Sequence, residues 1–232
     1  MIKYYFDIDQ NTDEWFALRC GVVTASVVKA LLTSKLKIAD NDTVRTMAYE
    51  FAAQIEYKNV EEMPQTFHMM RGHLEEELAR DAYNDNYFQV EECGFVTNEK
   101  DGMKIGYSPD GIVGDDGLIE IKSRIQKHQV KTIVNGVVPS EYMMQIQTGL
   151  YVTERQWCDF VSYSNGMPLF VKRVEPDKEI HDLIETAISK FYERVDAILE
   201  IYRDNASKLV QTERVELDFD TEIQASEGEQ NA

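Results

Sequence analysis

Apolar residues recur at helical spacing along several stretches of the chain. Between Val44 and Ile55 they stand three and four positions apart, which is the period of an amphipathic helix. A longer stripe of the same kind runs from Ile180 to Tyr202. Thr12 is a suitable cap for an earlier helix, because acidic residues follow it in the first turn. The pattern predicts helices over 12–20, 24–32, 44–55, 70–83, 141–153 and 180–202.

Between the fourth and fifth of these helices, the pattern changes to short β-branched or alternating segments interrupted by glycine. Such segments predict consecutive strands of one sheet. The sequence GDDG at 114–117 lies between two of them and is typical of a hairpin turn. The predicted strands cover 88–98, 102–114, 118–123, 157–164 and 169–176. This order of elements indicates an α/β or α+β fold with a central mixed β-sheet flanked by helices.

Length and composition favour a single domain. The chain has 232 residues, 43% of them hydrophobic, and can therefore build one sizeable core. We expect that domain to span residues 1–205. Residues 206–232 end in a polar, acidic stretch without Lys or Arg after Arg214, and we expect them to form a mobile or partner-bound tail.

Targeting and cysteine content favour a cytoplasmic protein. No apolar run approaches the ~18 residues that a membrane span needs, and the first ten residues lack the pattern of a secretory signal. The three cysteines are far apart in the sequence, which fits a reducing compartment and neither a disulfide framework nor a zinc site. The four histidines show no metal-ligand spacing.

The net charge of −18 argues, taken alone, against a nucleic-acid partner, since phosphate binding needs lysine and arginine. The distribution of charge changes this interpretation. Residues 15–39 and 121–136 contain no Asp or Glu, so two basic windows interrupt an acidic chain. The cations in these windows are Arg19, Lys29, Lys35, Lys37, Lys122, Arg124, Lys127 and Lys131.

The predicted strand at 118–123 carries two opposite charges. Side chains alternate between the faces of a strand, so Glu120 and Lys122 share one face, while Ile119 and Ile121 point to the core. Pairing through the predicted turn brings Asp110 near Glu120. Two carboxylates and an ammonium group are then expected at one end of the sheet.

Oxygen ligands of this kind suit Mg²⁺ or Mn²⁺. A bound divalent ion polarises a phosphoryl oxygen, and two ions together also steady the leaving oxygen. Lys122 can orient or deprotonate the attacking water, or stabilise charge in the transition state. The alternative is an exposed cross-strand pair of Glu120 and Lys122, with Asp110 serving only as a turn residue.

The order Pro109-Asp110, then Glu120-x-Lys122, resembles the PD-(D/E)xK nuclease core. Other segments resemble one branch of that superfamily, the phage λ exonuclease and YqaJ-type viral recombinases. The matching segments, in chain order, are LRCGVVTAS at 18–26, RGHLEEELAR at 71–80, SPDG at 108–111, IEIKS at 119–123 and YMMQIQTGLYVT at 142–153. The resemblance implies a restriction-endonuclease-like core in a bacterial or phage-encoded protein of the bacterial cytoplasm.

The resemblance also assigns roles in the active site. Asp110 and Glu120 would be the principal metal ligands, with the backbone carbonyl of Ile121 as a further ligand. Lys122 would be the catalytic lysine, and Glu76 would complete the acidic site through a bound water. Glu76 is expected on a helix face apart from a buried stripe of Leu74, Leu78 and Ala82.

Further residues match positions that contact DNA in the family. Gln145 corresponds to a glutamine on the helix beside the site, where an ordinary polar position on an amphipathic helix is the alternative. Arg19, Ser26 and Ser108 correspond to a pocket for a 5′-terminal phosphate, and a rigid, permanently charged arginine suits that role. Arg124, in the second basic window, is a further candidate for DNA contact.

The family implies an Mg²⁺-dependent exonuclease that digests one strand of duplex DNA 5′→3′ to mononucleotides. Mn²⁺ is the expected substitute, with two ions in each site. The 3′ single strand left behind would serve a single-strand annealing protein, and a homotrimeric ring is the expected assembly. The alternatives are a flap or structure-specific endonuclease, an exonuclease of opposite polarity, and a non-catalytic DNA-binding module.

Overall fold

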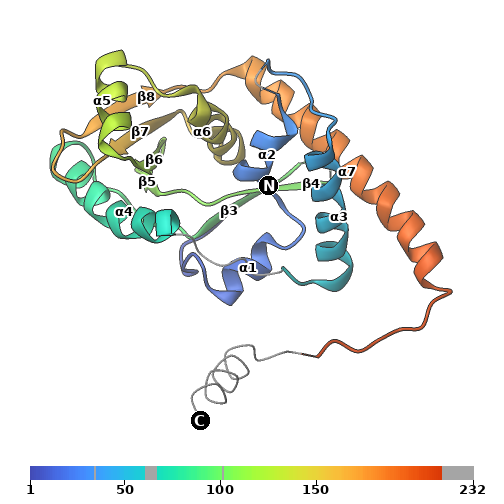
Figure 1. The fold of residues 1–232 in the computed structure, drawn as a ribbon. Coiled ribbons are helices and arrows are strands. Elements are labelled where there is room, and N and C mark those ends of the chain that lie inside the picture. Colours follow the sequence, from blue (N-terminus) through green and yellow to red (C-terminus); the bar gives the residue numbers. More distant parts are fainter. Residues whose placement is uncertain (34, 61–66, 101, 216–232) are drawn as a thin grey trace, which may run out of the picture. The chain divides into compact units, whose positions relative to one another are not determined.

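The computed structural model describes residues 1–33, 35–60, 67–100 and 102–215 (Figure 1). The helices are α1 (Asp13–Arg19), α2 (Ala25–Leu31), α3 (Asp42–Tyr57), α4 (Phe67–Asn86), α5 (Gln126–Asn135), α6 (Ser140–Thr153) and α7 (Lys178–Ala206). The strands are β1 (Ile2–Tyr5), β2 (Val23–Thr24), β3 (Phe95–Lys100), β4 (Met103–Tyr107), β5 (Gly111–Val113), β6 (Gly117–Ser123), β7 (Trp157–Tyr163) and β8 (Phe170–Val174). All six predicted helices are therefore present.

Residues 1–199 form one compact unit, and a second unit begins at Glu200, within α7. The mobility predicted for the C-terminal tail concerns residues that lie mostly outside the described part, which ends at residue 215. No helix in the described part of the chain is both long enough and apolar enough to cross a lipid bilayer.

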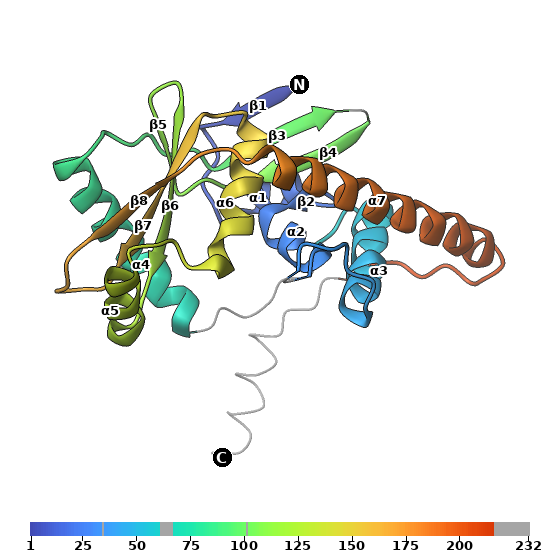
Figure 2. The same cartoon turned by 90° about the horizontal axis from the view of Figure 1, so that it is seen from above.

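The strands form two four-stranded mixed sheets rather than the one sheet predicted. The first has the order β1-β3-β4-β2 and the second the order β5-β6-β7-β8 (Figure 2). The division falls at 108–110, between β4 and β5. Pro109 has no backbone N–H to give to a neighbouring strand, so the chain can leave one sheet here and enter the next.

Helix α6 lies between the two sheets and contacts β3 and β4 of the first as well as β7 of the second (Figure 2). Its Gly149 lies against the ring of Tyr107 on β4, where an added β-carbon would stand 2.7 Å from the ring carbon Cζ. The main hydrophobic core combines residues from both sheets with α2, α3, α6 and α7.

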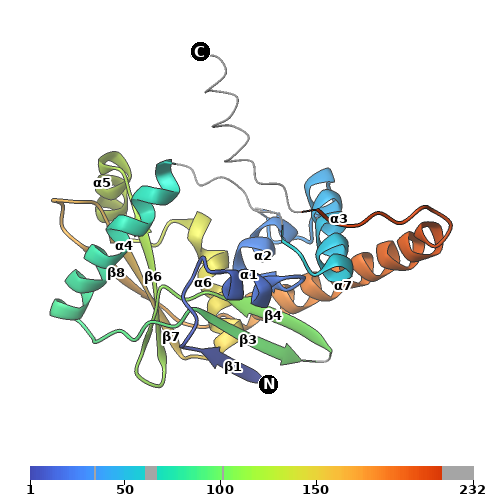
Figure 3. The same ribbon diagram turned by 90° about the horizontal axis from the view of Figure 1, so that it is seen from below.

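Helix α4 crosses the other face of the second sheet (Figure 3). Ala79 and Tyr83 of this helix are fully buried. They belong to a core cluster with Val113, Ile119, Ile121 and Val161. Ile119 and Ile121 therefore pack into a core, as the alternation along β6 predicts.

The prediction that Leu74, Leu78 and Ala82 form a buried stripe on α4 was wrong. Leu74 and Leu78 are 75% and 48% exposed. The helix instead packs through Ala79 and Tyr83, which Glu76 precedes by three and seven positions, so that Glu76 shares their face. The carboxylate predicted for the active site therefore faces the sheet side of the helix and not the solvent side.

Two strands and one helix were not predicted. Strands β1 and β2 are too short to show a clear alternation of apolar and polar residues. They form by pairing, β1 with β3 and β2 with β4. Helix α5 occupies most of the second basic window, with Gln129 and Thr132 buried and Val130 and Val134 exposed. Polar residues are thus buried and apolar residues exposed, the reverse of the usual amphipathic helix. The spacing of apolar residues therefore did not predict this helix.

Candidate active site

The β5–β6 hairpin positions Asp110. Gly111 pairs with Ile119 across the hairpin, and the turn between the strands carries Gly114 in the left-handed conformation at φ 51°. The Asp110 carboxylate then accepts a hydrogen bond from the backbone N–H of Ile121 through Oδ2 at 2.6 Å. The predicted pairing through this turn is confirmed, and it places Asp110 beside the middle of β6.

Glu120 is fully buried. Its Oε2 accepts a hydrogen bond of 2.8 Å from the hydroxyl of Tyr107, and its Oε1 forms an ion pair with the ammonium of Lys122. Tyr107 lies on β4 of the first sheet, so this bond joins the two sheets at the site. An exposed cross-strand pair, the alternative reading of this strand, is therefore contradicted by the burial of Glu120.

Burial raises the pKa of two acids of the site, Asp110 and Glu76. Burial, followed by the charge of Glu120, holds the pKa of Asp110 well above its ordinary value. Burial also raises the pKa of Glu76, although the charge of Arg80 opposes this shift. Negative charge on these two carboxyl groups is therefore unfavourable in the folded protein when no cation is bound.

Lys122 is half-buried beside these acids. Burial alone would lower the pKa of its ammonium, but the charges of Glu120 and Asp110 outweigh burial and raise the pKa. The ammonium also lies 5.8 Å from the ring centre of Tyr142 on α6. Lys122 is consequently a cation at neutral pH, held at the end of the acidic cluster.

A cavity of about 310 Å³ opens onto this cluster. Its lining includes Glu76 and His73 of α4, Asp110, and the consecutive residues Ile121 and Lys122. Helix α4 thus supplies one wall and the β5–β6 hairpin the other. The cavity brings Glu76, Asp110 and Lys122 together as the resemblance predicts.

The residues of this cavity suit a divalent cation in donor type. Mg²⁺ is commonly held by one or two carboxylates together with water, and Asp110 in the cavity lining and the buried Glu120 behind it provide such oxygens. Within the part of the chain described, no three His, Cys, Asp or Glu side chains form a complete metal cage. A cation here would therefore need ligands from the backbone carbonyl of Ile121, from water or from the substrate.

Arg124, the further candidate for DNA contact, is buried. It is 8% exposed, and its Nη1 donates to Oε1 of Glu141 at 2.9 Å and to the hydroxyl of Tyr142. Arg124 thus fixes the tyrosine that lies beside Lys122, and its predicted DNA contact stays a prediction. Gln145 is half-buried on α6, one turn after Tyr142.

The predicted phosphate pocket is built around Trp15. The indole Nε1 donates to the hydroxyl of Ser108 at 3.1 Å, and Nη1 of Arg19 donates to the same hydroxyl at 3.2 Å. The guanidinium of Arg19 lies 4.1 Å from the centre of the Trp15 ring. Burial lowers the pKa of Arg19 to about 10, and no carboxylate of the described residues offsets that shift.

Ser26 stands at the start of α2. Its hydroxyl shares a hydrogen bond of 3.0 Å with that of Thr24, and Thr24 pairs in parallel with Gly106 of β4. Ser108 follows Gly106 by two residues. Ser26 and Ser108 therefore follow neighbouring parallel strands at the same edge of the first sheet.

Sequence reasoning missed several residues that shape the site: His73, Arg80, Tyr107, Ser123 and Tyr142. Arg80 and His73 lie within the matched segment 71–80, so helical spacing from Glu76 was a usable indication for both. No sequence pattern indicated Tyr107, because its contact with Glu120 depends on how two separate sheets pack.

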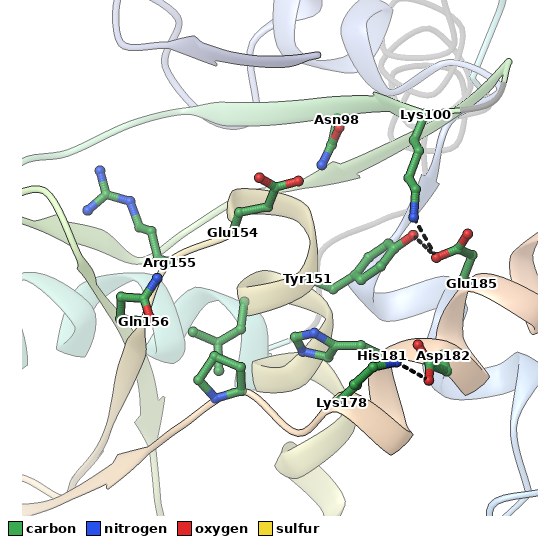
Figure 4. Close-up of a pocket in the computed structure, with 12 residues that line it drawn as sticks. Asn98, Lys100, Tyr151, Glu154, Arg155, Gln156, Lys178, His181, Asp182 and Glu185 are labelled. Carbon is green, nitrogen blue, oxygen red and sulfur yellow. Dashed lines mark hydrogen bonds and ion pairs between the residues drawn. The ribbon is translucent and has the colours of Figure 1, made fainter.

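A larger cavity of about 440 Å³ lies against α6 and α7 and contains none of the predicted site residues (Figure 4). Four of its charged side chains form two ion pairs, Lys100 with Glu185 and Lys178 with Asp182. Glu185 accepts from Lys100 at 2.8 Å and from Tyr151 at 3.0 Å, and Lys178 donates to Asp182 at 2.6 Å. Size alone is therefore a poor guide to chemistry in this molecule.

Comparisons with known proteins agree with the geometry. The model of the YqaJ-like viral recombinase domain matches residues 14–156, more than half of the chain. No curated protein matches the chain. An alkaline exonuclease from Laribacter hongkongensis, LHK-Exo, is 36% identical with a TM-score of 0.75, and the match covers 86% of this chain and 100% of that chain.

Two further solved structures are similar. LHK-Exo in complex with dAMP is 36% identical with a TM-score of 0.73, over 86% of this chain and 100% of that chain. A phage-related exonuclease from Haemophilus somnus 129PT is 14% identical with a TM-score of 0.55, over 77% of this chain and 95% of that chain, and supports the fold alone. The predicted fold class is confirmed, and the chain belongs to the YqaJ-like viral recombinase family.

Proposed function

We propose that this protein is an Mg²⁺-dependent exonuclease that digests one strand of duplex DNA 5′→3′ to mononucleotides. The observation that carries the proposal is the buried Glu120, which pairs with Lys122 beside the carboxylate of Asp110. The family supports a nuclease, and the similar LHK-Exo is described as an alkaline exonuclease.

Each residue of the cluster has a role in the proposal. Asp110, Glu120 and the carbonyl of Ile121 would hold the cation, with Glu76 contributing through water. Once bound, the cation would polarise the scissile phosphate. Lys122 would orient the attacking water and stabilise charge that develops on the phosphate, since its ammonium stays protonated. Mn²⁺ would replace Mg²⁺, and two ions in each site are part of the proposal.

The direction of digestion is proposed from the pocket around Arg19. Its guanidinium is half-buried, lies over the Trp15 ring and donates to Ser108, and these contacts hold it in a position suited to binding an anion. A guanidinium carries five N–H donors, and the bond to Ser108 uses one of them. The complex of LHK-Exo with dAMP supports binding of a nucleoside monophosphate in a similar protein.

A linear duplex carrying different labels at its two strand ends tests the function. With Mg²⁺, we expect the 5′ label to be released first, as a mononucleotide, and the 3′ strand to remain. EDTA should stop the reaction, and covalently closed plasmid should survive. Cleavage of the plasmid would support an endonuclease, early release of the 3′ label the opposite polarity, and binding without degradation a non-catalytic module.

Arg19→Ala should erase most of a preference for 5′-phosphorylated ends. A hydrogen bond to a charged group contributes about 1.5–3 kcal/mol, so wild type should prefer the phosphate about ten- to a hundred-fold at ~1.4 kcal/mol per decade. Rates on phosphorylated and unphosphorylated duplexes measure this, with Lys37→Ala as a control cation from the same basic window. Equal slowing on both ends would reduce Arg19 to a general backbone contact.

A homotrimeric ring and a single-strand annealing partner, in the cytoplasm of a bacterial host, complete the proposal. Exposed apolar residues on and after α5 support burial against another copy of the chain. They are Val130, Ile133, Val134 and Val137, between 38% and 77% exposed. Sedimentation equilibrium should give the mass of three chains, and a monomer would contradict the ring. Titration with a purified annealing protein tests the partner.

A further inference from the structure

The guanidinium of Arg80 contacts three separate parts of the site region. Nη2 donates to Oε1 of Glu76 at 2.7 Å, and Nε donates to the backbone carbonyl of Asp110 at 3.2 Å. Nη1 forms an ion pair with Oε2 of Glu92 at 3.1 Å. The Arg80 side chain is only 13% exposed, so these contacts lie largely away from water.

These contacts connect elements that approach the site from different directions. Glu76 belongs to α4, whereas Asp110 directly precedes β5 of the second sheet. Glu76 and Asp110 line the same cavity. A planar guanidinium that binds both the carboxylate of Glu76 and the main chain of Asp110 fixes their relative position.

The ion pair of Arg80 with Glu92 contributes less than the other two contacts. Its side chain is 75% exposed, and an ion pair with such a group adds little to stability in water. The two inward contacts therefore account for the position of Arg80. A lysine at this position has a single ammonium and no planar fork, so it cannot reproduce both contacts in the same geometry.

We propose that Arg80 is a positioning residue, which sets the affinity of the site for its divalent cation by holding Glu76 and Asp110 in place. The inference rests on the proposed function. Groups that orient metal ligands from behind typically change metal affinity about ten- to a hundred-fold when they are replaced. Arg80 itself touches neither DNA nor cation in this account.

Metal binding without DNA tests the inference apart from activity. Binding of Mn²⁺ to the full chain can be followed by electron paramagnetic resonance for wild type, Arg80→Lys and Arg80→Gln. We expect both variants to bind Mn²⁺ about ten-fold more weakly or worse, and excess Mg²⁺ to restore most of the hydrolysis rate. The control is Arg45→Lys, because Arg45 pairs with Asp40 and Asp42 away from the site.

Thermal melts show whether each variant is folded. If Arg80→Lys does not fold, Arg80→Gln is used for the Mn²⁺-binding test. Unchanged Mn²⁺ affinity in a folded variant overturns the inference, as does a rate loss that excess Mg²⁺ does not restore. Failure of the proposed function looks different: wild type itself would then not degrade DNA with Mg²⁺. An active wild type with unaffected Arg80 variants rejects the positioning role alone.

Discussion

Glu120→Gln and Asp110→Asn are each expected to lower the hydrolysis rate at least about a thousand-fold, or ~4 kcal/mol in activation free energy. Both substitutions keep the shape of the side chain and remove a charge that the cation needs. Glutamine is preferred to alanine at 120, because Glu120 is fully buried and accepts a hydrogen bond from Tyr107. Single-turnover hydrolysis of a labelled duplex measures the loss.

Thermal stability gives an independent control for Asp110→Asn. Because the pKa of Asp110 is raised in the folded chain, its ionisation at neutral pH favours unfolding. That destabilisation is absent below the ordinary pKa of an aspartate and grows as pH rises above it. In EDTA at neutral pH, the asparagine variant should melt at a higher temperature than wild type. An inactive variant that melts higher has lost chemistry and not structure, whereas wild-type activity would refute the assignment.

Lys122→Ala is expected to slow single-turnover hydrolysis about a hundred- to a thousand-fold while DNA binding in Ca²⁺ is retained. The ammonium acts mainly as charge develops in the transition state. Its removal frees Oε1 of Glu120, so cation affinity should not fall. Lys122→Arg should recover little activity, because the larger guanidinium does not fit the place of a compact ammonium.

Separate measurements of cation affinity, DNA binding and turnover distinguish this role from a structural one. A structural lysine would, when replaced, change melting temperature or DNA binding along with the rate. Unchanged single-turnover rates in Lys122→Ala would reject any catalytic role. A loss confined to DNA binding would make Lys122 a phosphate contact instead.

The sequence was sufficient for the parts of the site that depend on local geometry. Alternation along 118–123 placed Glu120 and Lys122 on one face, and glycines at 114 and 117 predicted the turn that brings Asp110 alongside. These relations depend on neighbours within one hairpin, so a single stretch of sequence contains them.

The packing of helices against the sheets could not be predicted from the sequence in this way. Helix α4 carries Leu74 and Leu78 on its exposed face and packs through Ala79 and Tyr83 against the second sheet. Periodicity identifies an apolar face but not the partner that covers it. Helix α5 shows the same limit, since its buried Gln129 donates to the carbonyls of Ser162 and Pro168.

The close approach of Gly149 to Tyr107 limits which residues position 149 can accept. The hydroxyl of this tyrosine donates a hydrogen bond to Glu120, so the ring position is part of the proposed active site. Any side chain at 149 would press on that ring from the opposite element. The proposed active site therefore depends on a residue of α6 that contributes no side chain to it, and a larger residue at 149 is expected to move Tyr107 and disturb its bond to Glu120.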